Sequence, residues 1–266
     1  MFTPQITIGM PALQLVNNLP SVHGIDIITG HALNSERVPQ TYHFKVYSPS
    51  PALEKRLEAL APENESIKHI LEEAVRLRAL ATTNLIPLWD SVFFAASVAD
   101  RGGVFVRHAA KQNPNDDQGE MLAIKRDELI SGRLGEKVAT LPRNRAIAIC
   151  STCTLMDGST LHIPMIDFRI LPDPQSLTII RDGLREIRQT SGVILESGNS
   201  YHFYGFKLLE REEWAEFLGN CLLLAPLTDA RYIAHRLVEG MGALRITRSD
   251  LKEKIPCVVD IFDKPQ

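Results

Sequence analysis

A serine and a histidine two residues apart follow a turn in the C-terminal half of the chain. Ser200 and His202 come directly after Ser197-Gly198-Asn199, whose residue types tolerate the left-handed backbone of a tight turn. Side chains alternate along a strand, so a strand over 201–206 places the hydroxyl and the imidazole on one face. Such a pair, beside the main-chain N–H groups of a turn, can bind an anion. The alternative is a histidine that is hydrogen-bonded within a half-buried sheet.

Two carboxylates and an arginine have the chemistry to extend such a site. Asp167 lies in the apolar run 162–171, and Arg169 follows two residues later, so both side chains are expected on one strand face. Asp229 stands just before 230–237, a segment of helical spacing, as a plausible N-cap. Carboxylates are ligands for hard divalent cations, and a guanidinium binds phosphate oxygens in bidentate geometry. The alternative for Asp167 and Arg169 is an ordinary ion pair on an edge strand.

The elements of the C-terminal half have an order that can bring these residues together. We expect strands over 146–155, 162–171, 193–195, 201–206, 243–248 and 255–262, and helices over 174–190, 210–224 and 230–237. A strand–helix–strand crossover makes the strands at Asp167 and Val193 parallel, or nearly so, and neighbours in one sheet. Asp167 and the turn before His202 can then lie on the same side of that sheet. Pro164 favours an early or edge position in the second strand.

The N-terminal half is less regular. Apolar runs over 24–29 and 42–47 predict strands, and apolar residues at helical spacing predict helices over 51–81, interrupted at Pro62, and over 87–99 and 121–130. The fold class expected for the whole chain is α+β. We predict an α+β region of unknown topology and role over 1–140, followed by a core over 141–266 that carries the candidate site.

Composition and charge indicate a soluble globular protein and leave nucleic-acid binding open. The 266 residues are 44% hydrophobic and 23% charged, with a formal net charge of −3, so any nucleic-acid binding must come from a local patch. No run approaches the ~18 apolar residues of a membrane helix, and the N-terminus lacks the pattern of a signal peptide. We therefore expect no membrane association and a cytoplasmic protein. Cys150 and Cys153 have Cys-x-x-Cys spacing, but the four cysteines are expected to be reduced thiols and not zinc ligands.

Three short motifs, in their order along the chain, resemble the archaeo-eukaryotic primase (primase-polymerase) superfamily. Asp167 in an apolar strand, Ser200-x-His202 and the Leu-Thr-Asp that ends at Asp229 are similar to that family's hhhDhD/E, sxH and hD motifs. The resemblance covers roughly residues 145–262, and it rests on the order and spacing of motifs that are individually short. It implies an RRM-like catalytic core, an antiparallel or mixed sheet with helices packed on it.

The resemblance also implies roles for the candidate residues. Asp167 and Asp229 would be catalytic and would bind a divalent metal, Mg or Mn, while Ser200, His202 and Arg245 would contact the nucleotide. To the nucleotide-binding group we add Arg169 and Arg248, the latter from the same short basic strand as Arg245. The implied partners are a nucleoside triphosphate and a DNA or RNA strand.

Arg169 is a departure from the family's pattern, because the second acid of the first motif is expected at its position. The chain is therefore interpreted as a divergent member that lacks this acid. Asp173, Glu196 or Asp260 could supply the missing oxygen ligand. Otherwise the site binds one metal, or polymerase chemistry has been lost and a nucleotide or nucleic-acid surface has been kept.

Two main hypotheses of function follow. The first is metal-dependent nucleotidyl transfer by a primase-polymerase-like enzyme in DNA replication, repair or bacterial defence. The second is a catalytically degenerate module that holds nucleotide or nucleic acid for a partner protein encoded in the same operon. A third hypothesis is a structural α+β protein. A third carboxylate within reach of Asp167 and Asp229 would favour the enzyme.

Overall fold

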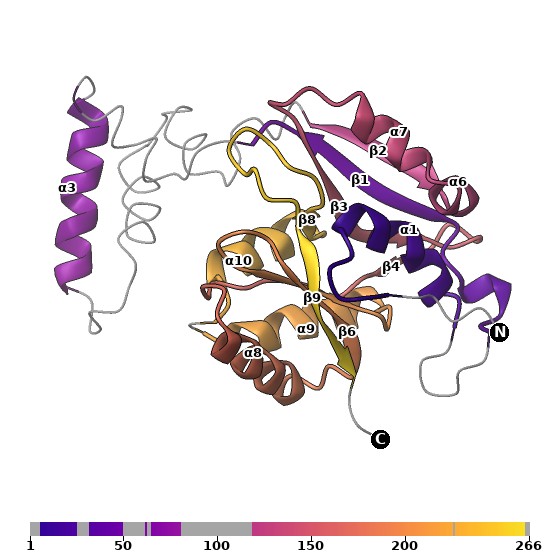
Figure 1. The fold of residues 1–266 in the computed structure, drawn as a ribbon. Helices are drawn as coiled ribbons and strands as arrows, with labels where there is room; N and C mark the ends of the chain where they lie inside the picture. The colour runs from indigo at the N-terminus through magenta and orange to yellow at the C-terminus, as the bar shows by residue number, and fades with distance from the viewer. Residues whose placement is uncertain are drawn as a thin grey trace. The chain divides into compact units, whose positions relative to one another are not determined.

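A computed structural model of the protein describes residues 6–25, 32–49, 62, 65–80, 119–225 and 227–263 (Figure 1). The chain divides into two compact units, one of Met1–Ser48 with Gly119–Gln266 and the other of Pro49–Gln118. The predicted boundary at residue 140 falls within the first unit. The assignment of roles to 1–140 and 141–266 stays a prediction.

Helix α3 (Glu65–Leu80) belongs to the second unit and confirms part of the amphipathic helix predicted over 51–81. The helix predicted over 87–99 lies outside the described residues, as does most of the strand predicted over 24–29. Among the helices that the structure describes, none is both long and apolar enough to cross a membrane.

The first sheet takes strands from both halves of the sequence. Its strands are β1 (Thr41–Tyr47), β2 (Glu120–Lys125), β3 (Ala146–Thr154), β4 (Thr160–His162) and β8 (Ala243–Arg245). The order is β2-β1-β3-β4, β8 also pairs with β3, and every pairing is antiparallel. A tight turn joins β3 to β4: Gly158 has a φ of +86°, and the Ser159 N–H donates to Asp157 Oδ1 at 2.9 Å.

The second sheet carries the candidate site. Its strands are β5 (Met165–Asp167), β6 (Ser191–Glu196), β7 (Tyr201–Gly205) and β9 (Cys257–Asp263), in the order β5-β7-β6-β9 with antiparallel pairings throughout. Two antiparallel sheets with helices confirm the predicted α+β class.

Two predictions about this sheet are corrected. The strand expected over 162–171 is two strands in different sheets, because Pro164 has no N–H to continue a ladder and the chain passes there from β4 to β5. The strands β5 and β6 run in the same direction, but they are not neighbours. The hairpin strand β7 lies between them and pairs with both.

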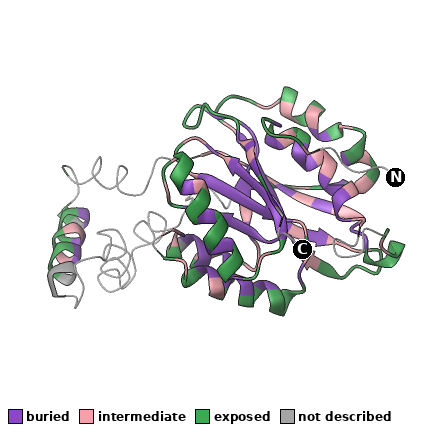
Figure 2. Ribbon diagram, turned by 60° about the horizontal axis from the view of Figure 1, so that its bottom comes forward, coloured by how far each residue is buried: buried purple, intermediate pink, exposed green. Residues whose placement is uncertain are grey.

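Helices of both halves complete the first unit. They are α1 (Ala12–Val22), the 3₁₀ helix η1 (Ser35–Arg37), α6 (Arg126–Ile130), α7 (Arg133–Ala139), α8 (Pro174–Glu186), α9 (Arg211–Leu222) and α10 (Ala230–Glu239). The last three confirm predicted helices. In Figure 2 these helices expose one side, whereas the strands are largely buried.

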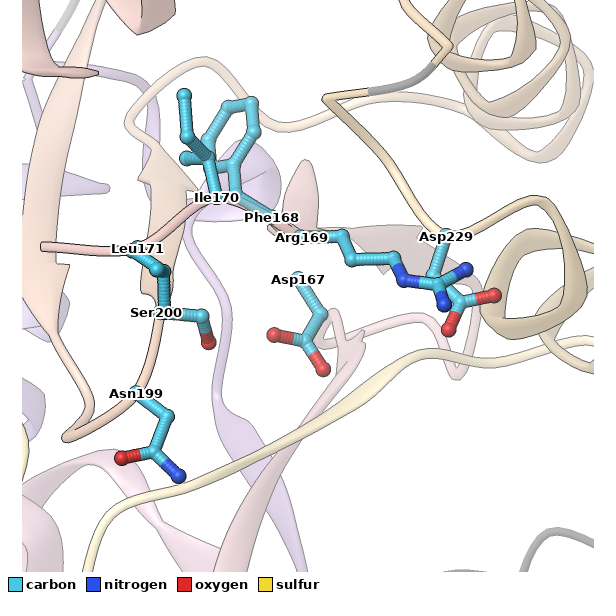
Figure 3. Close-up of a pocket in the computed structure, with 8 residues that line it drawn as sticks. All are labelled: Asp167, Phe168, Arg169, Ile170, Leu171, Asn199, Ser200 and Asp229. Atoms are coloured by element: carbon cyan, nitrogen blue, oxygen red, sulfur yellow. The ribbon is translucent and has the colours of Figure 1, made fainter. Parts of the chain in front are cut away.

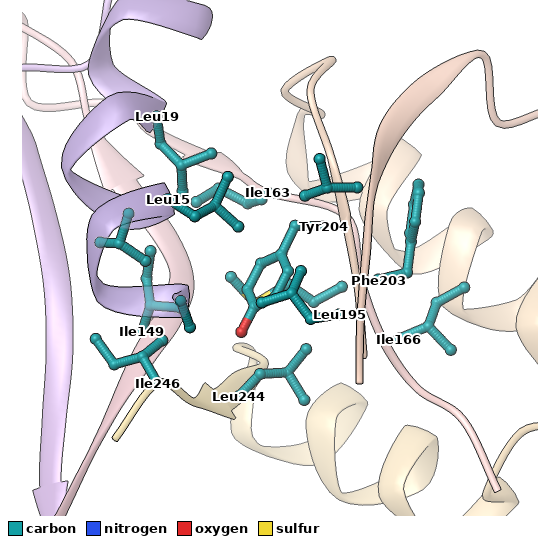
Figure 4. Packing of buried hydrophobic residues seen from close by; sticks show 14 of the residues in the cluster. Leu15, Leu19, Ile149, Ile163, Ile166, Leu195, Phe203, Tyr204, Leu244 and Ile246 are labelled. Atoms are coloured by element: carbon teal, nitrogen blue, oxygen red, sulfur yellow. The ribbon is translucent and has the colours of Figure 1, made fainter. Parts of the chain in front are cut away.

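Two N-terminal elements differ from prediction. Helix α1 was not predicted from the sequence, and it buries Leu15 and Leu19 completely. The helix predicted over 121–130 is strand β2 followed by α6, because residues 120–125 pair with β1 along its length and this pairing overrides the helical spacing. Figure 4 shows the resulting core, in which Leu15 and Leu19 of α1 face Leu195 and Tyr204 of the second sheet.

Candidate functional site

A pocket of about 240 Å³ opens beside the end of β5, the β6–β7 turn and the start of α10 (Figure 3). Its lining residues are Asp167, Phe168, Arg169, Ile170, Leu171, Asn199, Ser200 and Asp229. Four residues predicted from the sequence are thus brought together: Asp167, Arg169, Ser200 and Asp229. In Figure 3, Asp167 lies between Ser200 on one side and Arg169 with Asp229 on the other.

Main-chain hydrogen bonds at the end of β5 bring these distant residues together. The Phe168 N–H donates to the Tyr201 oxygen at 2.9 Å, and the Arg169 N–H donates to the Leu227 oxygen at 2.7 Å. The first bond joins β5 to β7, and the second joins it to the segment before α10. Asp229 is carried to the pocket by that segment, 62 residues after Asp167 in the sequence.

Asp229 also has a local structural role. The Tyr232 N–H donates to Asp229 Oδ1 at 3.3 Å, as expected for the N-cap of α10. Asp229 therefore presents its carboxylate at the pocket from a helix N-terminus, where negative charge is favourable.

The turn between β6 and β7 presents polar groups to the opposite wall. The Ser197 N–H donates to the Ser200 oxygen at 2.9 Å, and Gly198 adopts a φ of +120°, a backbone conformation that favours glycine. Asn199 and Ser200 follow and line the pocket. Sequence reasoning treated Asn199 only as a turn residue. Its amide, adjacent to the Ser-x-His pair, was the signal that could have identified it.

His202 does not line the pocket but lies against Asp167. The two residues are paired across β7 and β5, and His202 Nε2 is 3.7 Å from Asp167 Oδ1. That distance is longer than a hydrogen bond. Burial, assisted by the charges of Arg245 and Lys252, lowers the pKa of His202 to about 3, so the ring is neutral near pH 7 and the contact is not an ion pair.

The surroundings of Asp167 raise the pKa of its carboxyl group. Desolvation by the surrounding protein, and secondly repulsion from Asp229, raise the pKa of Asp167 to about 7. The charges of Lys252, Arg236 and Arg245 act in the opposite direction. The side chain keeps 38% of its surface exposed, so water and ions still reach the carboxylate.

Arg245 is buried and its guanidinium is bound to main-chain oxygens. Nη2 donates to the Ser197 oxygen at 2.8 Å, and Nη1 donates to the Lys254 oxygen at 2.9 Å and to the Thr247 oxygen. Burial lowers the pKa of Arg245. Neither Arg245 nor the exposed Arg248 is among the lining residues. Direct contact of either with a nucleotide stays a prediction.

The carboxylates proposed as additional metal ligands are engaged elsewhere. Asp173 caps α8 by accepting from the Gln175 N–H at 2.8 Å, while Glu196 pairs with Lys254 and Asp260 pairs with Arg181. Within the described ranges, no group of three or more His, Cys, Asp or Glu residues is arranged to hold a metal ion. The residues that the structure describes therefore do not fit a two-metal centre, which needs more oxygen ligands than Asp167 and Asp229 provide.

A comparison with known protein families identifies the class of this protein. Residues 125–256 match the family described as AEP-like, archaeo-eukaryotic primase 1D-like, and this stretch contains every predicted site residue. The chain belongs to the archaeo-eukaryotic primase superfamily, as a divergent member with Arg169 at the position of the second acid of the first motif. No curated protein and no solved structure matches the chain.

Proposed function

We propose that this protein binds the phosphate groups of a nucleotide directly in the pocket, through Arg169, without a two-metal centre. The observation that carries the proposal is the place of Arg169, which lines the same pocket as Asp167 and Asp229. In the part of the chain that the structure describes, its guanidinium has no ion pair or side-chain hydrogen bond, so its donors are available to a ligand.

The chemistry of the pocket supports phosphate as that ligand. A fixed guanidinium repels a divalent cation at short range and matches phosphate oxygens in bidentate geometry. Ser200 and Asn199 add a hydroxyl and an amide donor on the opposite wall. The raised pKa of Asp167 acts in the same direction, because a carboxyl that is protonated part of the time repels phosphate less.

Family membership supports a nucleoside triphosphate as the source of the phosphate groups. On this proposal the protein is a primase-like module that holds a nucleotide, together with a DNA or RNA strand, for a partner protein in the cytoplasm. Replication, repair and defence are the processes in which such a module would act.

A second candidate function is metal-dependent nucleotidyl transfer with Mg or Mn. The observation that favours it is the repulsion between Asp167 and Asp229, which a single cation between the two carboxylates would relieve. On this candidate Asp167 and Asp229 would be the metal ligands and the catalytic acids.

Calorimetric titration with ATP, in EDTA and in MgCl₂ or MnCl₂, distinguishes the two candidates. We expect the wild type to bind ATP in EDTA and Arg169→Gln to bind at least tenfold more weakly. Arg211→Gln, which removes an exposed arginine outside the pocket lining, should bind normally. Binding that requires metal, together with incorporation of labelled nucleotide on primed or unprimed templates, would establish the second candidate instead.

A further inference from the structure

His202 is largely buried and is not one of the residues that line the pocket. Its side chain is only 8% exposed, and it stands opposite Asp167 in the β5–β7 register. The pocket is lined by Asp167 and by Asn199 and Ser200 of the adjoining turn, but not by His202. The imidazole therefore lies beside Asp167 on the neighbouring strand, outside the pocket lining.

Of the two ring nitrogens of His202, Nε2 is the one that lies near a polar group of the described residues. Nδ1 is buried and has no hydrogen-bond partner within them, whereas Nε2 lies 3.7 Å from Asp167 Oδ1. The tautomer that carries its proton on Nε2 directs a donor toward the carboxylate. The backbone of β7 and edge-on packing against Tyr204, with ring centroids 6.5 Å apart, hold the ring in this orientation.

Asp167 needs such a restraint because Arg169 lies close to it. The two residues are separated by one position and line the same pocket, yet no ion pair joins them among the described residues. Carboxylate and guanidinium groups pair readily when geometry allows it. Such a pair would occupy the guanidinium donors that the proposed function assigns to phosphate.

We infer that His202 is a positioning residue, which restrains the Asp167 carboxylate from the neighbouring strand and so keeps Arg169 available to phosphate. The inference rests on the proposed function, and it gives His202 a different task from the phosphate contact that the sequence suggested. On this inference His202 affects ligand binding only by restraining Asp167. The effect of replacing His202 should therefore disappear when residue 167 cannot carry a charge.

Titrations in EDTA with ATP and with inorganic tripolyphosphate test this role in a double-mutant cycle. The variants are His202→Phe, which removes the ring nitrogens, Asp167→Asn, and the two combined. His202→Gln retains an amide nitrogen near the position of Nε2. Tyr204→Phe is the control, because it removes only a buried hydroxyl on the same strand and keeps the ring that packs against His202. Thermal unfolding verifies that each variant is folded.

We expect His202→Phe to weaken binding three- to tenfold in the wild-type background and less than twofold in the Asp167→Asn background. His202→Gln and Tyr204→Phe should stay within twofold of the wild type. Loss of tenfold or more in His202→Gln would show that the imidazole contacts phosphate itself and would overturn the inference. So would an equal loss from His202→Phe in both backgrounds, or no loss in either.

Two further results keep the inference separate from the proposed function. If the wild type binds neither ligand, or binds both as well after Arg169→Gln, the proposed function fails and the inference fails with it. If Arg169→Gln abolishes binding but the cycle shows no coupling, only the inference fails. His202→Gln decides the question if His202→Phe does not fold, since it retains the contact to Asp167 but not a phosphate-binding imidazole.

Discussion

Arg245 Nη2 donates a hydrogen bond to the main-chain oxygen of Ser197 at 2.8 Å, and this bond joins the first sheet to the turn of the second. The same guanidinium binds the Lys254 and Thr247 oxygens in the connection between β8 and β9. Through its bond to Ser197, Arg245 thus stabilises the turn that places Asn199 and Ser200 at the pocket.

Arg245→Met should destabilise the protein by about 3 kcal/mol, because it leaves three main-chain oxygens without their charged donor. Denaturant unfolding measures the change. Arg248→Met is the control: Arg248 is exposed, and its removal should change stability by less than about 0.5 kcal/mol. An Arg245→Met variant with wild-type stability but no ATP binding would contradict the structural role and support direct nucleotide contact.

Arg169→Glu should convert the pocket from phosphate binding toward metal binding. The substitution restores an acid at the family's second position and gives the pocket a third carboxylate beside Asp167 and Asp229. We expect Mn²⁺ affinity, measured by calorimetry without nucleotide, to rise at least tenfold, and ATP binding in EDTA to fall at least tenfold.

Arg211→Glu makes the same change of charge outside the pocket lining, so it controls for net charge and should leave both affinities within twofold. Robust metal-dependent primer synthesis by the wild type, lost in Arg169→Glu, would contradict the phosphate-binding role of Arg169 and favour the enzyme hypothesis.

Local patterns in the sequence were sufficient to predict much of the second sheet. The β6–β7 hairpin follows from an apolar run, a Gly-Asn turn and an aromatic run, and α8 follows from helical spacing after Asp173 and Pro174. Strand order was not predictable in this way, because periodicity does not specify which strand pairs with which. The position of β7 between β5 and β6 depends on such pairing between strands that are distant in the sequence.

The same limit applies to the site. Residue type and motif order predicted that Asp167, Arg169, Ser200 and Asp229 could act together, and these four line one pocket. Residue type and motif order could not indicate that Arg245 is buried and bound to main-chain oxygens. Its burial depends on how the β8–β9 connection packs.

His23 should make the protein less stable in acid. The ring is buried, with Nδ1 3.0 Å from the Tyr42 hydroxyl, and burial, assisted by the charge of Arg126, lowers the pKa of His23 to about 3. The unfolded chain binds a proton near pH 6.5, whereas the folded protein does not until about pH 3, so stability present above pH 6.5 is lost as the pH falls through this window.

His23→Gln should remove this part of the acid sensitivity. Between pH 7 and pH 4.5 the variant should lose about 2–3 kcal/mol less free energy of unfolding than the wild type. The comparison of variant with wild type is needed because Asp167 changes stability with the opposite sign. Its pKa is raised to about 7, so its contribution to stability is lost as the pH rises through that value. Denaturant unfolding at the two pH values measures the difference, and equal losses in both proteins would contradict the assignment.

Gly192→Ala should disrupt the hairpin that carries the pocket turn. A Cβ at Gly192 would lie 2.5 Å from the main-chain oxygen of Tyr204 and 2.6 Å from Phe203 Cζ, and the main-chain oxygen cannot move without breaking the β6–β7 pairing. We expect a loss of about 2–4 kcal/mol in denaturant unfolding, together with weaker ATP binding as the turn shifts.

Gly219→Ala is the matched control: nothing lies within 4 Å of its added Cβ on the exposed side of α9, so the helix should gain about 0.5–1 kcal/mol. A Gly192→Ala variant as stable as the wild type would show that β6 and β7 can separate without cost, and would remove the basis for treating this hairpin as a rigid support of the site.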